Sequence, residues 1–201
     1  MYKKGKKVEA PIGPGCDFHG YGEEIRRQLA LLMPKGEKKG VKILDVGTGY
    51  GMNAEFLAHQ LPKGAKKIWS IDPSEEVLEN ARKKVKESIP ELAADIEFVT
   101  GSAEKISFED GFFDAVVNVM VLHHIEHLED SLREMARVTK SGGKLILIDY
   151  APEAHKLDWS NPHYESDFFR PEQVRDLLKK MGLETGVQSF GLWYIVEASK
   201  S

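Results

Sequence analysis

Cysteine is nearly absent from this chain of 201 residues, in which Cys16 stands alone. An internal disulfide and a metal site built from several thiolates are therefore both excluded. Long apolar runs are missing as well, and the start MYKKGKKVEAPIGPGC lacks the apolar centre of a signal peptide. We expect a soluble, cytoplasmic protein that does not act within a membrane.

An excess of basic residues is also lacking, because the formal net charge is −4 and the pI is about 6.0. Proteins that wrap nucleic acid through a general positive field usually carry a strong basic excess, so this class is disfavoured. Apolar residues make up 41% of the chain and charged residues 30%, which suits one compact domain with a sizeable core. Abundant Lys and Glu with few Asn and Gln resemble the composition of thermophile proteins.

Short β-rich runs alternate with helical patterns from Val41 onward. The runs are nearly continuous in apolar character, which is typical of strands covered on both faces. Strands are expected at 41–46, 67–72, 96–100, 113–121 and 144–150, and amphipathic helices at 53–61, 75–88 and 128–139. Ser74 is placed to cap the second of these helices. This alternation predicts a parallel sheet with right-handed crossovers.

The regions on either side of the alternating core add a helix at each end and a hairpin. A helix is expected at 23–33, ended by Pro34, and another at 172–181. The runs 184–190 and 192–199 read as two strands with almost no connection between them. One edge of the sheet should therefore be antiparallel.

A glycine turn follows the first strand in DVGTGYG, Asp45 to Gly51. Dinucleotide sites need G-x-G-x-x-G, but Met52 holds the place of the third glycine. The carboxylate of Asp45 would repel a pyrophosphate and attract a cationic amine. Asp72 ends the second strand at the distance expected of an acidic residue that binds ribose hydroxyls. The pattern indicates a ligand that has a ribose and an amine but no pyrophosphate.

Four stretches carry a family resemblance in the correct order: ILDVGTGYG, SIDPSEEVLENAR, FDAVVNVMVLHHI and LREMARVTKSGGKLILID. Together they resemble the class I S-adenosylmethionine-dependent methyltransferases, particularly the ubiquinone/menaquinone biosynthesis branch. The resemblance implies an α/β fold, a Rossmann-like three-layer sandwich with a mainly parallel seven-stranded sheet and an antiparallel edge hairpin. It also implies an enzyme that uses S-adenosylmethionine as cofactor and releases S-adenosylhomocysteine.

The resemblance further divides the chain, as one domain, into three parts. Residues 1–40 would form an N-terminal lid and helix, and residues 41–150 the cofactor-binding core. Residues 151–201 would supply an acceptor loop, the last helix and the edge hairpin.

The same resemblance assigns cofactor contacts by position. The glycine turn would surround the methionine part, Asp72 would hold both ribose hydroxyls, and Pro73 would lie against the adenine. Where the family usually has an acidic residue near the adenine amine, this chain has Ser102, so Glu104 could share that role. The implied cofactor-binding residues are Asp45, Gly47, Thr48, Gly49, Asp72, Pro73, Ser102, Ala103 and Asn118.

The stretch HHIEH, residues 123–127, contains the H-x-x-E-H pattern of one class of zinc peptidases. That chemistry needs the whole motif on one helix and a further ligand downstream, and nothing fixes such a ligand in register, so no metal is expected. Because the stretch follows the fourth strand, His123 or His124 should lie near the transferred methyl group. Either could take a proton from a phenol, enol or amine, with His124 slightly favoured, or both could simply pack at the turn.

The acceptor should be chosen by the irregular segments 1–22 and 151–170, which gather aromatic residues and histidines. These residues suit a small planar or apolar molecule, or they only cover the sheet edge. The basic cluster at 3–7 leaves RNA or a protein side chain open as acceptor, whereas NVMV lacks the Pro-Pro-aromatic run of enzymes that methylate amines of DNA bases. A noncatalytic cofactor-binding partner subunit and an NAD-dependent oxidoreductase also stay open, and the sequence does not predict the oligomeric state.

Overall fold

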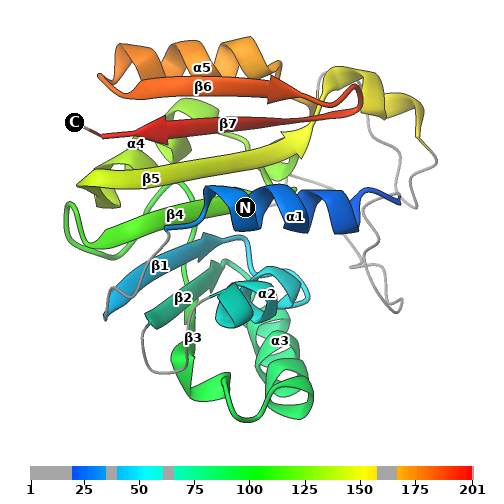
Figure 1. Ribbon diagram of the computed structural model, residues 1–201, viewed down its shortest axis with the longest axis vertical. Coiled ribbons are helices and arrows are strands. Elements are labelled where there is room, and N and C mark those ends of the chain that lie inside the picture. Colours follow the sequence, from blue (N-terminus) through cyan, green and yellow to red (C-terminus); the bar gives the residue numbers. More distant parts are fainter. Residues whose placement is uncertain (1–19, 35–39, 61–65, 158–166, 201) are drawn as a thin grey trace.

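The computed structural model describes residues 20–34, 40–60, 66–157 and 167–200. Its helices and strands alternate through most of the chain (Figure 1). The helices are α1 (Gly22–Leu32), α2 (Met52–Gln60), α3 (Glu75–Ser88), α4 (Leu128–Val138) and α5 (Pro171–Lys180), with short turns η2 (Ala93–Asp95), η3 (Leu122–His124) and η4 (Pro152–Lys156). The strands are β1 (Val41–Val46), β2 (Lys66–Asp72), β3 (Ile96–Thr100), β4 (Phe113–Val119), β5 (Thr139–Tyr150), β6 (Glu184–Ser189) and β7 (Trp193–Ser199).

All seven strands join one sheet in the order β3-β2-β1-β4-β5-β7-β6. The pairings from β3 through β5 are parallel, whereas β7 runs antiparallel to both β5 and β6. The predicted mainly parallel seven-stranded sheet with an antiparallel edge hairpin is therefore confirmed. The strand order reverses between β1 and β4, and ligands of such sheets bind at the carboxyl ends of the strands beside this point.

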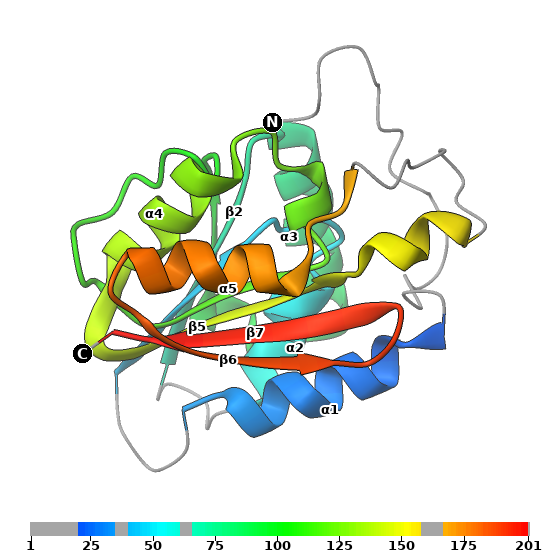
Figure 2. The same ribbon diagram turned by 90° about the horizontal axis from the view of Figure 1, so that it is seen from above.

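Helices cover both faces of the sheet and give the predicted three layers. Figure 2 shows α1 on one side of the sheet and α4 and α5 on the other. One apolar cluster joins α1, α2 and α3 to the sheet, and a second joins α4 and α5 to its opposite face. Because both faces are buried, the strands can be apolar without interruption, and β4 is buried along its whole length.

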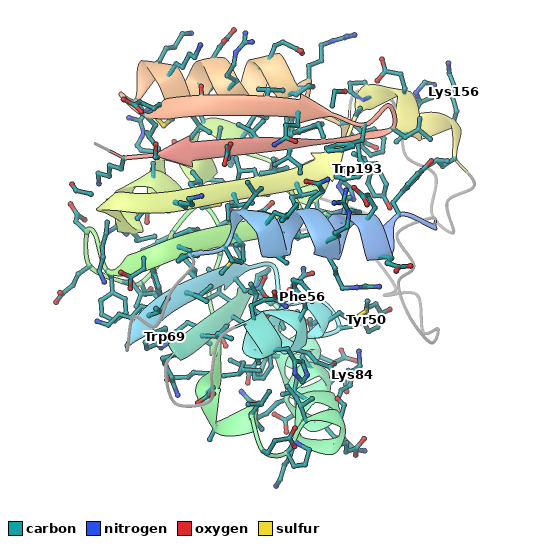
Figure 3. The ribbon with its side chains drawn as sticks, in the orientation of Figure 1. Tyr50, Phe56, Trp69, Lys84, Lys156 and Trp193 are labelled. Atoms are coloured by element: carbon teal, nitrogen blue, oxygen red, sulfur yellow. The ribbon has the colours of Figure 1, made fainter. Side chains whose placement is uncertain are left out.

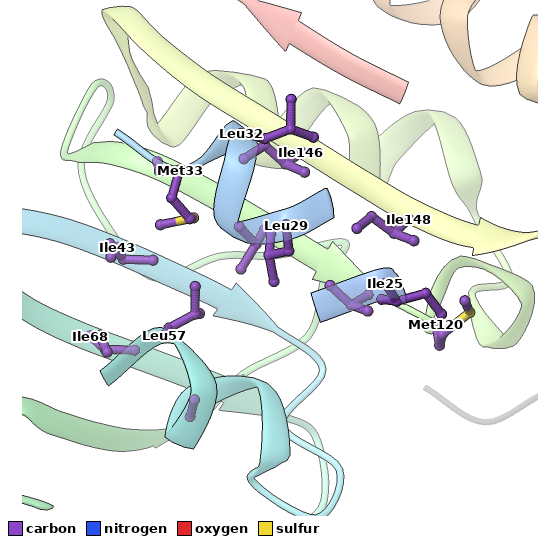
Figure 4. Packing of buried hydrophobic residues seen from close by; sticks show 14 of the residues in the cluster. Ile25, Leu29, Leu32, Met33, Ile43, Leu57, Ile68, Met120, Ile146 and Ile148 are labelled. Carbon is purple, nitrogen blue, oxygen red and sulfur yellow. The ribbon is translucent and has the colours of Figure 1, made fainter. Parts of the chain in front are cut away.

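The α1 helix shows how a helical repeat places side chains in the core. Ile25, Leu29 and Leu32 are spaced four and three residues apart, so they share one face, and all three are buried. Figure 4 shows this face over the middle of the sheet, with Ile43 and Ile146 beneath it. Each such side chain stabilises the fold by roughly 1.5–3 kcal/mol through burial.

The α3 helix keeps the predicted bounds, and its predicted cap is confirmed. Ser74 has an extended backbone, and its hydroxyl accepts a hydrogen bond from the Val77 amide at 3.3 Å. That bond satisfies one of the amides that a helix leaves without an internal partner.

Two predicted boundaries near the centre of the sheet were wrong. β5 begins at Thr139 rather than at Lys144, because Thr139 already pairs with Phe113 and a register shift follows, with Gly142 at φ +73° within the irregular stretch. β4 ends at Val119 rather than at Val121. Met120 there adopts φ +57°, a left-handed conformation that breaks the strand.

Arg137 of α4 fastens the connection between β3 and β4. Its guanidinium donates to the carbonyl oxygens of Phe108 and Ile106, each at 2.8 Å, and to Asp110 at 2.7 Å. It also donates to Glu134 at 2.7 Å, and Glu134 in turn accepts from the Ile106 amide. A single planar guanidinium on α4 therefore binds three residues of the connecting loop.

Replacing Arg137 by Lys should lower the free energy of unfolding by roughly 1–3 kcal/mol, because one ammonium cannot satisfy the separated acceptors. Urea unfolding followed by circular dichroism measures the change. Arg133→Lys is the matched control, since Arg133 on the same helix makes one exposed pair with Glu129. Equal stability of the two variants would show that the loop does not depend on Arg137.

Candidate functional site

The glycine turn after β1 is held against β2 by backbone hydrogen bonds. The amides of Gly47 and Thr48 both donate to the Ile71 carbonyl, at 2.9 and 3.0 Å. Gly47, Gly49 and Gly51 all have positive φ, between +50° and +92°. Residues with a side chain rarely tolerate that conformation, so the turn requires glycine at these places.

The three glycines face different surroundings. A Cβ at Gly47 would lie 2.4 Å from Cγ2 of Val121, and one at Gly51 would lie 3.1 Å from Cβ of Ala81. A Cβ at Gly49 would meet no atom within 4 Å. Gly47 and Gly51 therefore let protein pack against the turn, whereas Gly49 leaves its backbone open to a ligand. In Figure 3, the label Tyr50 marks this turn at the start of α2.

Asp45 is the last residue but one of β1, and it is 0% exposed. Ser70 lies opposite it on β2, and the Ser70 hydroxyl donates to Oδ2 at 2.7 Å. Oδ1 has no hydrogen-bond partner in the described part of the chain. Burial raises the pKa of Asp45 to about 7 against the effect of the Ser70 bond, with the Asp72 charge adding to the rise.

Asp72 links the glycine turn to the start of α3. Its Oδ1 accepts from the Ser74 amide at 3.0 Å, and its Oδ2 accepts from the Gly49 amide at 3.4 Å. Burial raises the pKa of this carboxyl, and the two backbone hydrogen bonds oppose the rise. The structure thus brings the two acidic residues of the sequence prediction to one turn, with Pro73 exposed beside them.

Asn118, on β4, leaves a second buried oxygen without a partner. Its side-chain amide donates to the Val46 carbonyl at 3.0 Å, while Oδ1 makes no hydrogen bond among the described residues. Unpaired buried oxygens are costly, and both Asp45 and Asn118 therefore suit a ligand that donates hydrogen bonds. A cofactor with a cationic amine meets that requirement, so the residues present fit S-adenosylmethionine.

Beyond the carboxyl end of β3, Ser102 is hydrogen-bonded to Glu104. The Ser102 hydroxyl donates to the Glu104 carboxylate, and the Glu104 amide donates back to the Ser102 oxygen at 3.1 Å. Glu104 Oε1 is buried and has no partner in the described part. The family resemblance expects an acidic residue at the position of Ser102, and Glu104 places a carboxylate oxygen close to that position. Ala103 packs against the apolar cluster on the α4 side.

The HHIEH stretch does not form one helix. His123 and His124 end the η3 turn, Ile125 to His127 are not helical, and α4 begins at Leu128. His127 is exposed. The geometry that a zinc peptidase needs is not met here. Residues 20–34, 40–60, 66–157 and 167–200 also contain no group of three or more side chains that could hold a metal.

His123 has a partner that sequence reasoning missed. Its Nδ1 lies 2.6 Å from Oδ1 of Asp149, and both residues are almost fully buried. The His124 ring lies next to it, with a centroid distance of 4.1 Å. The only sequence signal for Asp149 was an acid near the end of an otherwise apolar strand.

Part of the predicted acceptor region lies outside the described residues. This holds for Cys16, Phe18, His19 and the segment 158–166, which includes Trp159, His163 and Tyr164. In the described remainder, Phe168 is buried, and its ring centroid lies 5.5 Å from that of His123. No helix in the described ranges is both long and apolar enough to cross a membrane.

Comparison with known proteins places the chain among methyltransferases. The family described as "Methyltransferase domain" matches residues 44–147, more than half of the chain. The ubiquinone/menaquinone biosynthesis C-methyltransferase UbiE of Pseudomonas entomophila (strain L48) is 32% identical over 123 residues. That match covers 61% of this chain and 46% of the relative, so the chain spans about half the length of the curated relatives it matches.

Solved structures share the fold over most of the chain. A SAM dependent methyltransferase from Aquifex aeolicus superposes with a TM-score of 0.69 at 24% identity, covering 88% of this chain and 87% of that one. A putative methyltransferase of Haloferax volcanii, solved in complex with the Trm112 methyltransferase activator, gives 0.70 at 20% identity, covering 93% and 99%.

The family match confirms the predicted methyltransferase domain, and the solved structures confirm its fold. Because the family match covers more than half of the sequence, this chain belongs to the family of methyltransferase domains.

Proposed function

We propose that this protein transfers the methyl group of S-adenosylmethionine to a small aromatic acceptor. The observation that carries the proposal is the turn at Gly49, where two buried carboxylates, Asp45 and Asp72, flank a backbone left open on its outer side. The bound cofactor supplies an electrophilic methyl group on a positively charged sulfur. A site with a carboxylate on each strand end suits a positively charged ligand.

Each part of that cofactor has a fitting residue in this site. The unpaired oxygens of Asp45 and Asn118 would accept from its ammonium group. Asp72 would accept from the ribose hydroxyls, and Glu104 from the adenine amine. Gly47 would keep Val121 in place behind the turn, so the backbone there would stay close to the ligand.

The residues beyond the turn favour a planar acceptor. Rings of His123, His124, Tyr150 and Phe168 lie together, with centroid distances from His123 between 4.1 and 5.6 Å. Such a set suits an aromatic ring. The curated relatives are named for quinone biosynthesis, which supports a hydroxylated aromatic acceptor of that kind. RNA is less well supported because the chain has a net negative charge.

Wild-type protein should bind S-adenosylhomocysteine saturably in calorimetric titration and should not bind NAD. Asp72→Ala should weaken the binding of S-adenosylhomocysteine by roughly 1–3 kcal/mol through lost hydrogen bonds. Asp176→Ala, which removes an exposed carboxylate on α5, is the control and should bind normally. Equal affinities of the two variants would remove Asp72 from the site, and binding of NAD alone would overturn the proposal.

The buried Asp45 should make stability depend on pH. Its raised pKa means that the folded protein holds a proton that the unfolded chain releases between about pH 4 and 7. This contribution to the free energy of unfolding is fully present below about pH 4 and is lost as pH rises through 7. Between pH 5 and 8, urea unfolding should show that the free energy of unfolding of the wild type falls by roughly a few kcal/mol more than that of Asp45→Asn. If the free energy of unfolding of the two proteins changed with pH in the same way, the expectation would be contradicted.

Methyl transfer itself can be tested with a tritiated methyl group on the cofactor. Naphthohydroquinone, a simple phenol and bulk RNA serve as candidate acceptors in parallel. We expect label in the hydroxylated aromatic ring. Binding of S-adenosylhomocysteine without transfer to any acceptor would instead favour a noncatalytic cofactor-binding subunit.

A further inference from the structure

The Asp45 carboxylate belongs to a buried network with two hydroxyl groups. The Ser70 hydroxyl lies 2.7 Å from Asp45 Oδ2, and the Ser70 and Thr48 hydroxyl oxygens lie 2.8 Å apart. Asp45 and Ser70 are 0% exposed, and Thr48 is 2% exposed. The network therefore joins β1, β2 and the glycine turn without contact with bulk water.

This network can satisfy either protonation state of Asp45. An ionised carboxylate only accepts, so Ser70 then donates to Asp45 and Thr48 donates to Ser70. When Asp45 is protonated, Oδ2 can donate to Ser70, and the Ser70 hydrogen can turn to Thr48. The number of hydrogen bonds among the three side chains is the same in both states. A proton can thus be gained or lost at Asp45 without breaking the network.

The second acid at the turn, Asp72, decides which carboxyl holds a proton. The amides of Ser74 and Gly49 both donate to Asp72, and such donors favour its ionised form. Asp45 has one hydroxyl donor and is 0% exposed against 6% for Asp72. Burial and the charge of Asp72 raise the pKa of Asp45 to about 7. A proton bound at this turn therefore resides on Asp45.

The other elements around Asp45 contribute neutral groups. On β4, Val117 lies opposite Asp45, and the neighbouring Asn118 carries an uncharged amide. Asp45 shares the face of Ile43, which α1 and α2 cover. Figure 4 shows three of the covering side chains, Ile25, Leu29 and Leu57. No charged residue of α1 or α2 is buried, and the described part of the chain buries no Lys or Arg. Asp45 therefore meets a second carboxylate but no buried lysine or arginine.

The free oxygen of Asp45 suits a cation from outside the chain. Oδ1 is buried and has no hydrogen-bond partner among the described residues. The backbone of the same turn is open at Gly49, where a Cβ would meet no atom within 4 Å. An ammonium group only donates, and its charge favours the ionised carboxylate. An ammonium group at this place and a proton on Asp45 therefore compete.

We infer that Asp45 gives up a proton when the cationic amine of the cofactor binds, and that Ser70 is the positioning residue that holds the carboxylate in both states. This inference rests on the proposed use of S-adenosylmethionine. The proton leaves the Asp45 carboxyl for water, after which Oδ2 accepts from Ser70 and Oδ1 is available to the ammonium group. When the product leaves, Asp45 takes a proton back from water. Cofactor affinity is thereby coupled to pH.

The first test counts protons during calorimetric titration with S-adenosylhomocysteine, which carries the same amine. Titrations in phosphate and in imidazole buffer differ in heat by the number of protons released, because the two buffers have different heats of ionisation. The wild type should release close to one proton per ligand at about pH 6 and little at about pH 8. Asp45→Asn should release none. Equal heats in the two buffers for the wild type at about pH 6, or undiminished release in Asp45→Asn, would overturn the inference.

The dissociation constant should depend on the same group. Between about pH 5.5 and 6.5, the Kd of the wild type for S-adenosylhomocysteine should fall close to tenfold, and it should become constant above about pH 7.5. The ligand amine keeps its charge over this range. Asp45→Asn should show no such dependence, and at about pH 8 it should bind roughly tenfold more weakly than the wild type. The same pH dependence in both proteins would contradict a role for Asp45.

Ser70→Ala tests the positioning residue. The Ser70 hydrogen bond lowers the pKa of Asp45, so its loss should move the pH at which Kd becomes constant upward by up to about one unit. A purely structural defect would weaken binding by the same factor at every pH. Thr48→Val, which removes the second hydroxyl at similar size, should shift the profile in the same direction.

Ser131→Ala is the matched control for Ser70→Ala. Ser131 is also 0% exposed, but it lies on α4 and its hydroxyl has no partner in the described part of the chain. Its replacement should leave the pH profile of binding unchanged. An unshifted profile in both Ser70→Ala and Thr48→Val would overturn the role of the hydroxyl network.

Failure of the inference and failure of the proposed function give different results. If the wild type binds no S-adenosylhomocysteine at any pH, the proposed function falls. If it binds without exchanging a proton, the inference about Asp45 is overturned while the cofactor site stands.

Discussion

One carbonyl oxygen organises the cofactor side of this molecule. Ile71 accepts hydrogen bonds from both Gly47 and Thr48, so the end of β1 is fixed to the end of β2 before the chain turns into α2. The register that follows places Asp45 opposite Ser70. It also lets the Gly49 amide reach Asp72.

Two buried acids at the carboxyl edge of the sheet are satisfied to different degrees. Asp149 has two backbone donors and a histidine ring, and it is therefore complete within the protein. Asp45 has one hydroxyl donor, and its other oxygen has no hydrogen-bond partner among the described residues. Burial penalises the charged form of Asp45 and raises its pKa to about 7. The two acids therefore differ in what they can still bind: Asp149 is satisfied within the protein, whereas one oxygen of Asp45 can accept a further hydrogen bond.

The sequence predicted those features that depend on local pattern or on a fixed spacing. The bounds of α3, its Ser74 cap and the hairpin of β6 and β7 were correct, because capping and strand signals are carried by neighbouring residues. The early start of β5 was missed, since Thr139 joins the sheet through a distant pairing with Phe113. Asp149 was missed for the same reason. Its partner His123 is close only after β4 and β5 have paired, and neither residue reveals the other in the sequence.

Met120 lies between the residue that packs against the glycine turn, Val121, and the end of β4. A left-handed backbone is costly for a residue with a side chain, yet here it ends β4 while its amide still reaches the Ile148 carbonyl at 2.8 Å. The turn it produces seats Val121 against Gly47 and sets His123 beside Asp149. Strain at one residue is thus offset by contacts on both sides of it. Val121, which packs against Gly47, and His123, which contacts Asp149, are only two residues apart. One backbone turn therefore positions both the contact with the glycine turn and the buried His123–Asp149 pair.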